Sequence, residues 1–130
     1  MTRNTLLLGI PLMIFTLALS SCGVPSSPSD VIEEYIDAMV AKDDILTVNL
    51  SCVAWEENAK AEGAGFEGVD VSLADASCSV INESGDSATV SCTGNFIFQY
   101  AGGENEVIGL DRRNYSLVQE SGEWKMCGYK

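Results

Sequence analysis

The sequence contains no histidine in its 130 residues, and 7 lysines and arginines face 19 aspartates and glutamates, a formal net charge of −12. The lack of histidine excludes a Ser-His-Asp or Cys-His nucleophile system and a histidine-ligated zinc site. The shortage of basic residues excludes a protein held to nucleic acid by excess positive charge. The longest apolar run, residues 6–19, falls short of the roughly 20 residues of a membrane span. We therefore expect no transmembrane helix in the mature protein.

The beginning of the chain has the pattern of an export signal. Arg3 gives a positive start, the apolar run at 6–19 follows, and the small residues Ser20 and Ser21 stand directly before Cys22. We expect residues 1–21 to be a signal peptide that is removed on export.

Residues 19–22, with the sequence Leu-Ser-Ser-Cys, resemble the lipobox of bacterial lipoproteins. The resemblance implies that Cys22 takes a thioether-linked diacylglycerol and anchors the protein to the outer face of a bacterial membrane, either the cell membrane or the outer membrane. Acyl chains such as palmitate contribute about 0.8 kcal/mol per buried methylene, and two or more make a durable anchor. The alternative is an ordinary signal peptidase site. Asn-x-Ser triplets at Asn49, Asn82 and Asn114 keep open a glycosylated, eukaryotic secreted protein.

A tether and a first helix are predicted next. Residues 22–28 hold two prolines and several small residues that cannot bury enough surface to become ordered. Ser29 or Asp30 can cap a helix, and Asp30 with Glu33 has the spacing of a capping box. Apolar residues then recur at helical spacing up to Lys42, with acidic residues on the opposite face. The predicted buried stripe consists of Ile32, Tyr35, Ile36, Met39 and Val40.

A second helix is expected after Asp43 and Asp44, and the glycines at 63 and 65 end it. Its predicted apolar side consists of Ile45, Val48, Cys52, Trp55 and Ala59.

From about residue 69 the period changes from 3.6 to 2. Alternate residues from Ala88 to Tyr100 are apolar or small, which predicts a strand with one buried face. Residues 75–82 form its hairpin partner through a turn at 83–86, and two further strands are expected at 107–119 and 123–129. The sequence thus predicts an α+β domain over residues 29–130, in which N-terminal helices cover one face of an antiparallel four-stranded meander.

Four cysteines remain once Cys22 is set aside, and an even number in an exported chain favours two disulfides. If the first hairpin centres on the turn glycine at 85, Cys78 lies opposite Cys92, which leaves Cys52 for Cys127. The shorter loop should stabilise the fold by roughly 3 kcal/mol and the longer by up to about 4 kcal/mol. A zinc or redox site is disfavoured because no Cys-x-x-Cys pair is present.

Several segments together resemble small bacterial lipoproteins with a nuclear transport factor 2-like (cystatin-like) domain. They are the helix at 30–42, Leu-Ser-Cys at 50–52 with Trp-Glu at 55–56, Cys-Ser-Val at 78–80, residues 90–94 and the ending at 122–129. The resemblance implies a cone-shaped fold with helices packed on a strongly curved antiparallel sheet. The wider superfamily includes SnoaL-like cyclases, ketosteroid isomerase, scytalone dehydratase and many non-catalytic modules, so the fold alone does not decide the function.

We expect a non-catalytic binding or interaction module of the bacterial cell envelope, whose partner is a small apolar ligand or an envelope protein. The side chains expected to line an apolar pocket are Tyr35, Met39, Phe96, Phe98 and Tyr100. No catalytic residue, metal or cofactor is assigned.

The alternative is an isomerase or cyclase-type enzyme that uses a carboxylate and a tyrosine, chemistry that needs no histidine. Its candidate residues are Tyr35, Asp37, Tyr100, Asp111 and Tyr115. The basic pair Arg112-Arg113 is expected in a strand, either exposed or in a salt bridge, with an anion site as the alternative. A further alternative is a calcium site formed by Asp43 and Asp44, or by the acidic residues at 70–75. Neither segment has the ligand spacing of an EF-hand.

Overall fold

The computed structural model describes residues 27–130. The predicted signal peptide, Cys22 and most of the predicted tether lie outside these residues. Three helices come first: α1 (Pro28–Val40), α2 (Asp44–Asn49) and α3 (Glu56–Phe66), with the 3-10 turn η1 (Val53–Trp55) before α3. Five strands follow: β1 (Asp70–Ser84), β2 (Ser87–Gln99), β3 (Asn105–Gly109), β4 (Asn114–Glu120) and β5 (Glu123–Tyr129), with the 3-10 turn η2 (Leu110–Arg112) between β3 and β4.

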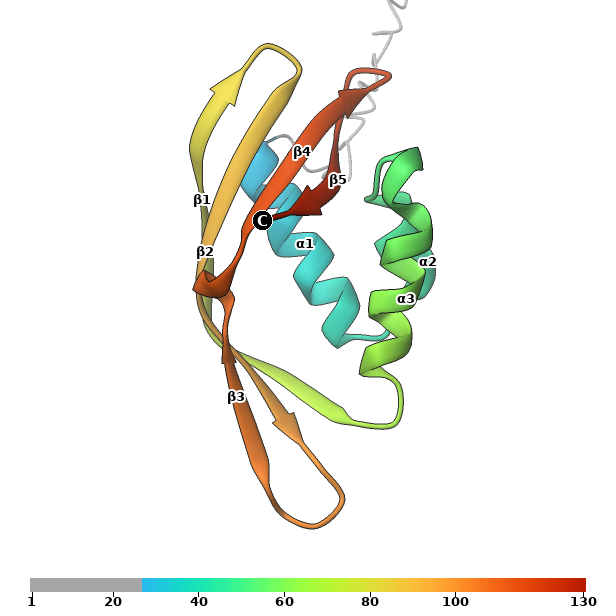
Figure 1. Ribbon diagram of the computed structural model, residues 1–130, viewed down its shortest axis with the longest axis vertical. Helices are drawn as coiled ribbons and strands as arrows, with labels where there is room; N and C mark the ends of the chain where they lie inside the picture. Colours follow the sequence, from blue (N-terminus) through green and yellow to red (C-terminus); the bar gives the residue numbers. More distant parts are fainter. Residues whose placement is uncertain (1–26) are drawn as a thin grey trace, which may run out of the picture.

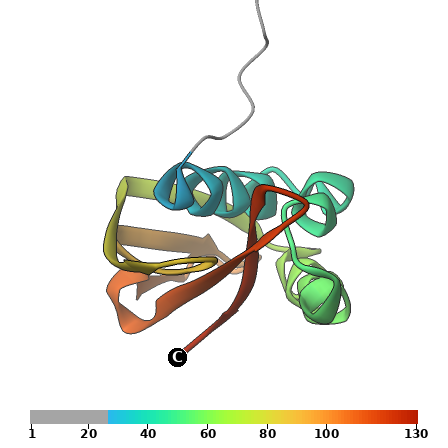
Figure 2. The same ribbon diagram turned by 90° about the horizontal axis from the view of Figure 1, so that it is seen from above.

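The strands form one curved antiparallel sheet, and the helices lie on one of its faces (Figures 1 and 2). The sheet order is β1-β2-β4-β5, and β3 also pairs with β2. The start of β2 pairs with β4, whereas its end pairs with β3. The β2–β3 hairpin extends beyond the helices at the lower end of Figure 1. The α+β class is therefore confirmed, with five strands rather than four.

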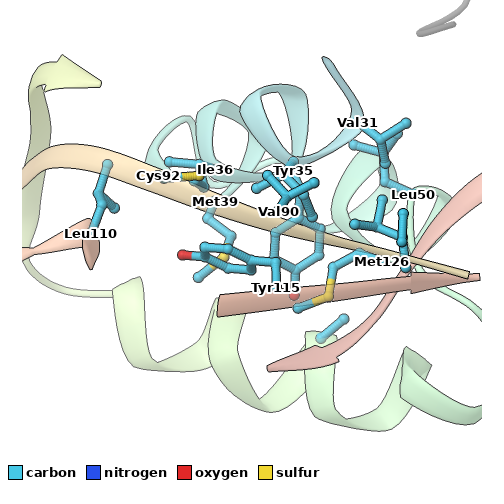
Figure 3. Close-up of a cluster of buried hydrophobic side chains, with 14 of the residues drawn as sticks. Val31, Tyr35, Ile36, Met39, Leu50, Val90, Cys92, Leu110, Tyr115 and Met126 are labelled. Carbon is cyan, nitrogen blue, oxygen red and sulfur yellow. The ribbon is translucent and has the colours of Figure 1, made fainter. Parts of the chain in front are cut away.

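The single strand predicted at 107–119 is wrong because η2 divides it. The turn brings the buried Leu110 against the sheet and lets β3 and β4 pair with different parts of β2. Figure 3 shows Leu110 apart from the other buried side chains, at this bend.

Helix α1 begins earlier than predicted. Ser27 is its N-cap, and its hydroxyl accepts a hydrogen bond from the Asp30 backbone nitrogen, while Pro28 takes the first helical position. A proline suits this position because its missing N–H would have no partner there anyway. The predicted capping box of Asp30 with Glu33 is wrong: Glu33 instead accepts a hydrogen bond of 2.8 Å from the backbone nitrogen of Cys78. The predicted apolar stripe of α1 is confirmed, since its residues are buried or pack on the core.

The continuous second helix is also wrong. The chain leaves the helical path after α2, where Ser51 forms a bridge to Met126 of β5 and backbone hydrogen bonds join Leu50 and Cys52 to the same residue. The break changes which side chains face inward: Ile45 is 77% exposed, and Thr47 is buried in its place. The two hydrogen bonds to Met126 cover part of the free edge of β5 and give the backbone of residues 50–52 partners outside a helix.

The core lies between α1 and the concave face of the sheet. In Figure 3, Tyr35 and Met39 of α1 meet Val90, Tyr115 and Met126 of the sheet. None of the helices in residues 27–130 has the length and apolar character needed to cross a bilayer.

Two disulfides join the pairs predicted from the sequence. Cys78 and Cys92 are register partners on β1 and β2, and their sulfurs are bonded. Cys52, beside the break after α2, is bonded to Cys127 of β5. Disulfides persist in oxidising compartments and are rare in the cytosol. They therefore indicate that the domain resides outside the cytosol.

Candidate functional site

A cavity of about 160 Å³ opens between α3 and the sheet. Its apolar wall consists of Met39, Phe66, Phe96, Phe98 and Ile108, and its polar side consists of Glu62, Arg113, Tyr115 and Tyr129. The residues come from α1, α3, four strands and the segment after η2, so only the complete fold assembles the cavity.

The aromatic wall follows from local periodicity. Phe96 and Phe98 are two residues apart on β2 and therefore lie on the same face. The Phe66 ring of α3 completes the cluster, with its centroid 5.5 Å from those of both strand residues. These separations are typical of favourable aromatic pairs.

Glu62 is the acidic group of the cavity. It lies one helical turn before Phe66 on α3, so both side chains project to the same side. Its side chain is 16% exposed. The Tyr35 hydroxyl donates a hydrogen bond of 2.9 Å to Glu62 Oε2, whereas the buried Oε1 atom accepts no hydrogen bond. Its charge is met on that side by the Arg113 guanidinium, at 3.6 Å.

Arg113 lies over an aromatic surface as well as beside Glu62. Its guanidinium carbon is 4.1 Å from the ring centroid of Tyr129, a cation-π geometry. Edge contacts with Tyr115 and Trp55 fix the Tyr129 ring in turn. The guanidinium is therefore held by one carboxylate and one aromatic face.

The phenols of the site are strongly biased toward their neutral form. Burial raises the pKa of Tyr115 to about 12; Glu62 and Tyr129 add to this, and Arg113 opposes it. Burial and the Glu62 carboxylate raise the pKa of Tyr35 well above its ordinary value. The Glu62 carboxylate also raises the pKa of Tyr129. Near neutral pH these hydroxyls are therefore hydrogen-bond donors rather than phenolates.

The structure places the five predicted lining residues in three groups. Met39, Phe96 and Phe98 line the cavity. Tyr35 is fully buried behind it and reaches it only through the bond to Glu62. Tyr100 lies elsewhere, 49% exposed near the tip of the β2–β3 hairpin, where its hydroxyl binds Glu106.

The other candidates separate in the same way. Tyr115 belongs to the site, whereas Asp37 and Asp111 are exposed and do not line the cavity. Arg112 and Arg113 do not lie in a strand as predicted: Arg112 ends η2, and only Arg113 reaches the cavity. The salt bridge considered for this pair is present, between Arg113 and Glu62.

Neither calcium hypothesis gains support. The Asp43 side chain caps α2 by accepting a hydrogen bond of 3.0 Å from the Leu46 nitrogen. Within residues 27–130 no group of three or more histidine, cysteine, aspartate or glutamate side chains is arranged to hold a metal ion.

The sequence reasoning missed Glu62, Phe66, Ile108 and Tyr129. A partial signal existed for one pair, because Glu62 and Phe66 are four residues apart and so can share a helix face. The break before α3 hid that signal, since a continuous helix places its apolar side along other residues. The prediction that the glycines at 63 and 65 end the helix is wrong, since α3 continues to Phe66.

A scan of the sequence against models of protein families gives no match, and a search of curated proteins finds no relative. Solved structures, in contrast, resemble the fold. A candidate dehydratase of the nuclear transport factor 2-like family from Streptomyces avermitilis superposes with a TM-score of 0.54 at 15% identity, covering 76% of this chain and 87% of that one.

Two further structures give the same result. A candidate polyketide cyclase from Pseudomonas putida has a TM-score of 0.54 at 14% identity, over 81% of this chain and 92% of that one. A SEC-C motif protein from Rhodopseudomonas palustris has a TM-score of 0.55 at 16% identity, over 80% and 77% of the two chains. At such identities the likeness shows the fold alone. The expected nuclear transport factor 2-like fold, with its curved sheet, is confirmed.

Proposed function

We propose that this chain, which has the nuclear transport factor 2-like fold, is a non-catalytic module of the bacterial cell envelope that binds a small ligand in the cavity between α3 and the sheet. The observation that carries the proposal is the composition of that cavity: five apolar side chains form one wall, and the charged pair Glu62–Arg113 lies on the polar side. Ligand sites commonly combine a mostly apolar lining with a few polar groups that orient the ligand.

The size of the cavity limits the ligand. A cavity of about 150 Å³ holds one benzene molecule, and this cavity measures about 160 Å³. The ligand is therefore a molecule with one ring or a short branched chain, carrying a single polar group toward Glu62 and Arg113.

The binding proposal is tested by filling the cavity. Benzyl alcohol, a one-ring probe, is titrated into the full chain with its disulfides intact, and NMR chemical shifts report binding. Ile108→Phe puts a ring into the cavity and should abolish binding. Val107→Phe is the matched control because Val107 is the preceding residue on β3, points to the opposite face and is 59% exposed. Binding that survives Ile108→Phe, or no binding to the unaltered chain, contradicts the proposal.

The envelope location rests on the leading segment and on the disulfides. The lipobox-like residues 19–22 support lipidation at Cys22, and the disulfides support a compartment outside the cytosol. In a bacterial host, metabolic labelling with a clickable palmitate should mark the protein, and Cys22→Ala should remove the label. Label on the Cys22→Ala protein, or none on the native one, contradicts lipid anchoring.

One observation favours a second function, an isomerase or cyclase-type enzyme: the Glu62 carboxylate lies in the cavity within hydrogen-bond reach of a tyrosine. A carboxylate can act as a base that removes a proton from the carbon next to a ketone. Phenol hydroxyls nearby can stabilise the resulting enolate by hydrogen bonds. Exchange of deuterium at the methyl group of acetophenone, followed by NMR, tests this chemistry. An enzyme should accelerate exchange, and Glu62→Gln should slow it by at least about 100-fold. The non-catalytic proposal expects the same slow exchange with and without the protein.

A further inference from the structure

The polar side of the cavity already holds a cation that belongs to the chain itself. The guanidinium of Arg113 lies 3.6 Å from Glu62 Oε1 and 4.1 Å from the centroid of the Tyr129 ring. A carboxylate beside an aromatic face is the combination that recognises organic cations. Arg113 therefore marks a place where a positive group is stabilised.

The hold on Arg113 is incomplete. The contact to Glu62 is longer than a hydrogen bond, and the Glu62 Oε1 atom is buried without a hydrogen-bond donor. The Arg113 side chain is 35% exposed, whereas that of Glu62 is only 16% exposed. A buried carboxylate oxygen without a donor is unfavourable. The arginine can thus move into water, but the carboxylate cannot.

We propose that the cavity binds a small organic cation, an ammonium group on an apolar body, whose positive group replaces the Arg113 guanidinium against Glu62 and Tyr129. This inference rests on the proposed ligand-binding function and names its ligand class. The apolar body occupies the aromatic wall formed by Phe66, Phe96 and Phe98. The ammonium donates to Glu62 Oε1, the atom that now lacks a donor.

Charge favours a cation over an anion at this place. The chain carries a formal net charge of −12, which attracts cations and repels anions. An anionic ligand would meet Arg113 but would also lie against Glu62, with a like charge close by. A cationic ligand keeps the pairing of one positive and one negative group and releases Arg113 to solvent.

The experiment compares two probes that differ in one group. Benzylamine is protonated near neutral pH, and benzyl alcohol is its neutral counterpart. Both are titrated into the full chain at low salt and followed by NMR. Benzylamine should bind the unaltered chain more tightly than benzyl alcohol, and its affinity should fall as salt is added. Arg113→Gln removes the competing cation and should tighten benzylamine about tenfold, with benzyl alcohol changed less than about twofold.

Glu62→Gln should weaken benzylamine by about tenfold or more and leave benzyl alcohol nearly unchanged. Glu57→Gln and Lys60→Gln are matched controls: both residues lie on α3, in an exposed ion pair with each other, and each substitution changes net charge as its counterpart does. Neither control should alter the ratio of the two affinities. If benzyl alcohol binds as well as benzylamine and Arg113→Gln has no effect, the cation inference is overturned and the binding proposal stands. If neither probe binds, both are overturned.

Discussion

The hydroxyl of Tyr35 on α1 donates a hydrogen bond of 2.9 Å to Glu62 of α3, although Tyr35 otherwise belongs to the buried apolar core. The bond joins the helix that packs on the sheet to the helix that carries the acidic group of the cavity. It also orients Glu62 so that one oxygen faces α1 and the other faces Arg113. This hydrogen bond therefore links a core residue of α1 directly to the acidic group of the cavity.

Tyr35→Phe should lower the free energy of unfolding by about 1 to 2 kcal/mol, because a mostly buried carboxylate oxygen loses its donor while the ring stays in place. Urea denaturation measures the change. Tyr100→Phe is the control: its hydroxyl also binds a glutamate, but at an exposed position, so the expected change is below about 0.5 kcal/mol. Equal losses in the two variants would show that the Tyr35 bond adds no more than a surface contact.

The two disulfides should differ in their contribution to stability. The Cys52–Cys127 bond spans 75 residues and the Cys78–Cys92 bond spans 14. Because a longer closed loop restricts the unfolded chain more, replacing the first pair by alanine should cost about 4 kcal/mol and the second about 3 kcal/mol. Denaturant midpoints of the two double variants measure this order. The reverse order would argue that the hairpin disulfide is needed by the native state itself, through the pairing of β1 with β2.

Much of the fold could be predicted because it depends on local pattern. The stripe of α1 and the alternation of β2 each come from one continuous segment with a clear period. The pairing of Cys78 with Cys92 followed from the position of a turn glycine, which sets the register of the hairpin. The arrangement of helices first and antiparallel strands after them was therefore readable without tertiary information.

The breaks and the site could not be predicted in this way. The helix ends after α2 because residues 50–52 pair with Met126, more than seventy positions later in the chain. Glu62 comes from α3, Arg113 directly follows η2 and Tyr129 comes from β5, and no spacing in the sequence links them. Tyr100 continues the alternation but follows the last residue of β2 and is 49% exposed. Tertiary contacts decided these features.

The buried phenols should make the fold sensitive to high pH. The pKa of Tyr115 is raised to about 12 in the folded state, above its ordinary value near 10. A raised pKa means that the folded state holds its proton more tightly, so this stability is fully present below pH about 10 and is lost as the pH rises toward about 12. The contribution of Tyr115 is about 2 to 3 kcal/mol.

Urea unfolding at a series of pH values, with short exposure at high pH to protect the disulfides, measures the loss. Tyr115→Phe should reduce the decline by the contribution of Tyr115, because it removes that ionising group and keeps the ring, while Tyr35, whose pKa is also raised, retains its share. Tyr100→Phe should leave the decline nearly unchanged, since Tyr100 is exposed. Stability that rises with pH in this window would contradict the assignment.

The bend of the β1–β2 hairpin requires glycine at position 94. Gly94 has a φ of +98°, and a β-carbon there would lie 2.5 Å from the Asp75 carbonyl oxygen. The register of the two strands shifts between Ala74 and Ser77, opposite this point. Gly94→Ala should therefore destabilise the fold by about 2 to 4 kcal/mol, since both the φ and the contact with backbone atoms oppose a side chain.

Gly65→Ala is the matched control for Gly94→Ala. Gly65 lies near the end of α3, with ordinary helical φ and no atom within 4 Å of an added β-carbon. Alanine should stabilise the helix there by about 0.5 to 1 kcal/mol, so the two substitutions should have opposite signs. Thermal unfolding of both variants measures them. A Gly94→Ala protein as stable as the native chain would mean that the hairpin keeps its curvature without the close approach of Gly94 to Asp75. Phe96 and Phe98 follow Gly94 on β2 and line the cavity. If the bend relaxes in Gly94→Ala, this variant should therefore also bind benzyl alcohol more weakly.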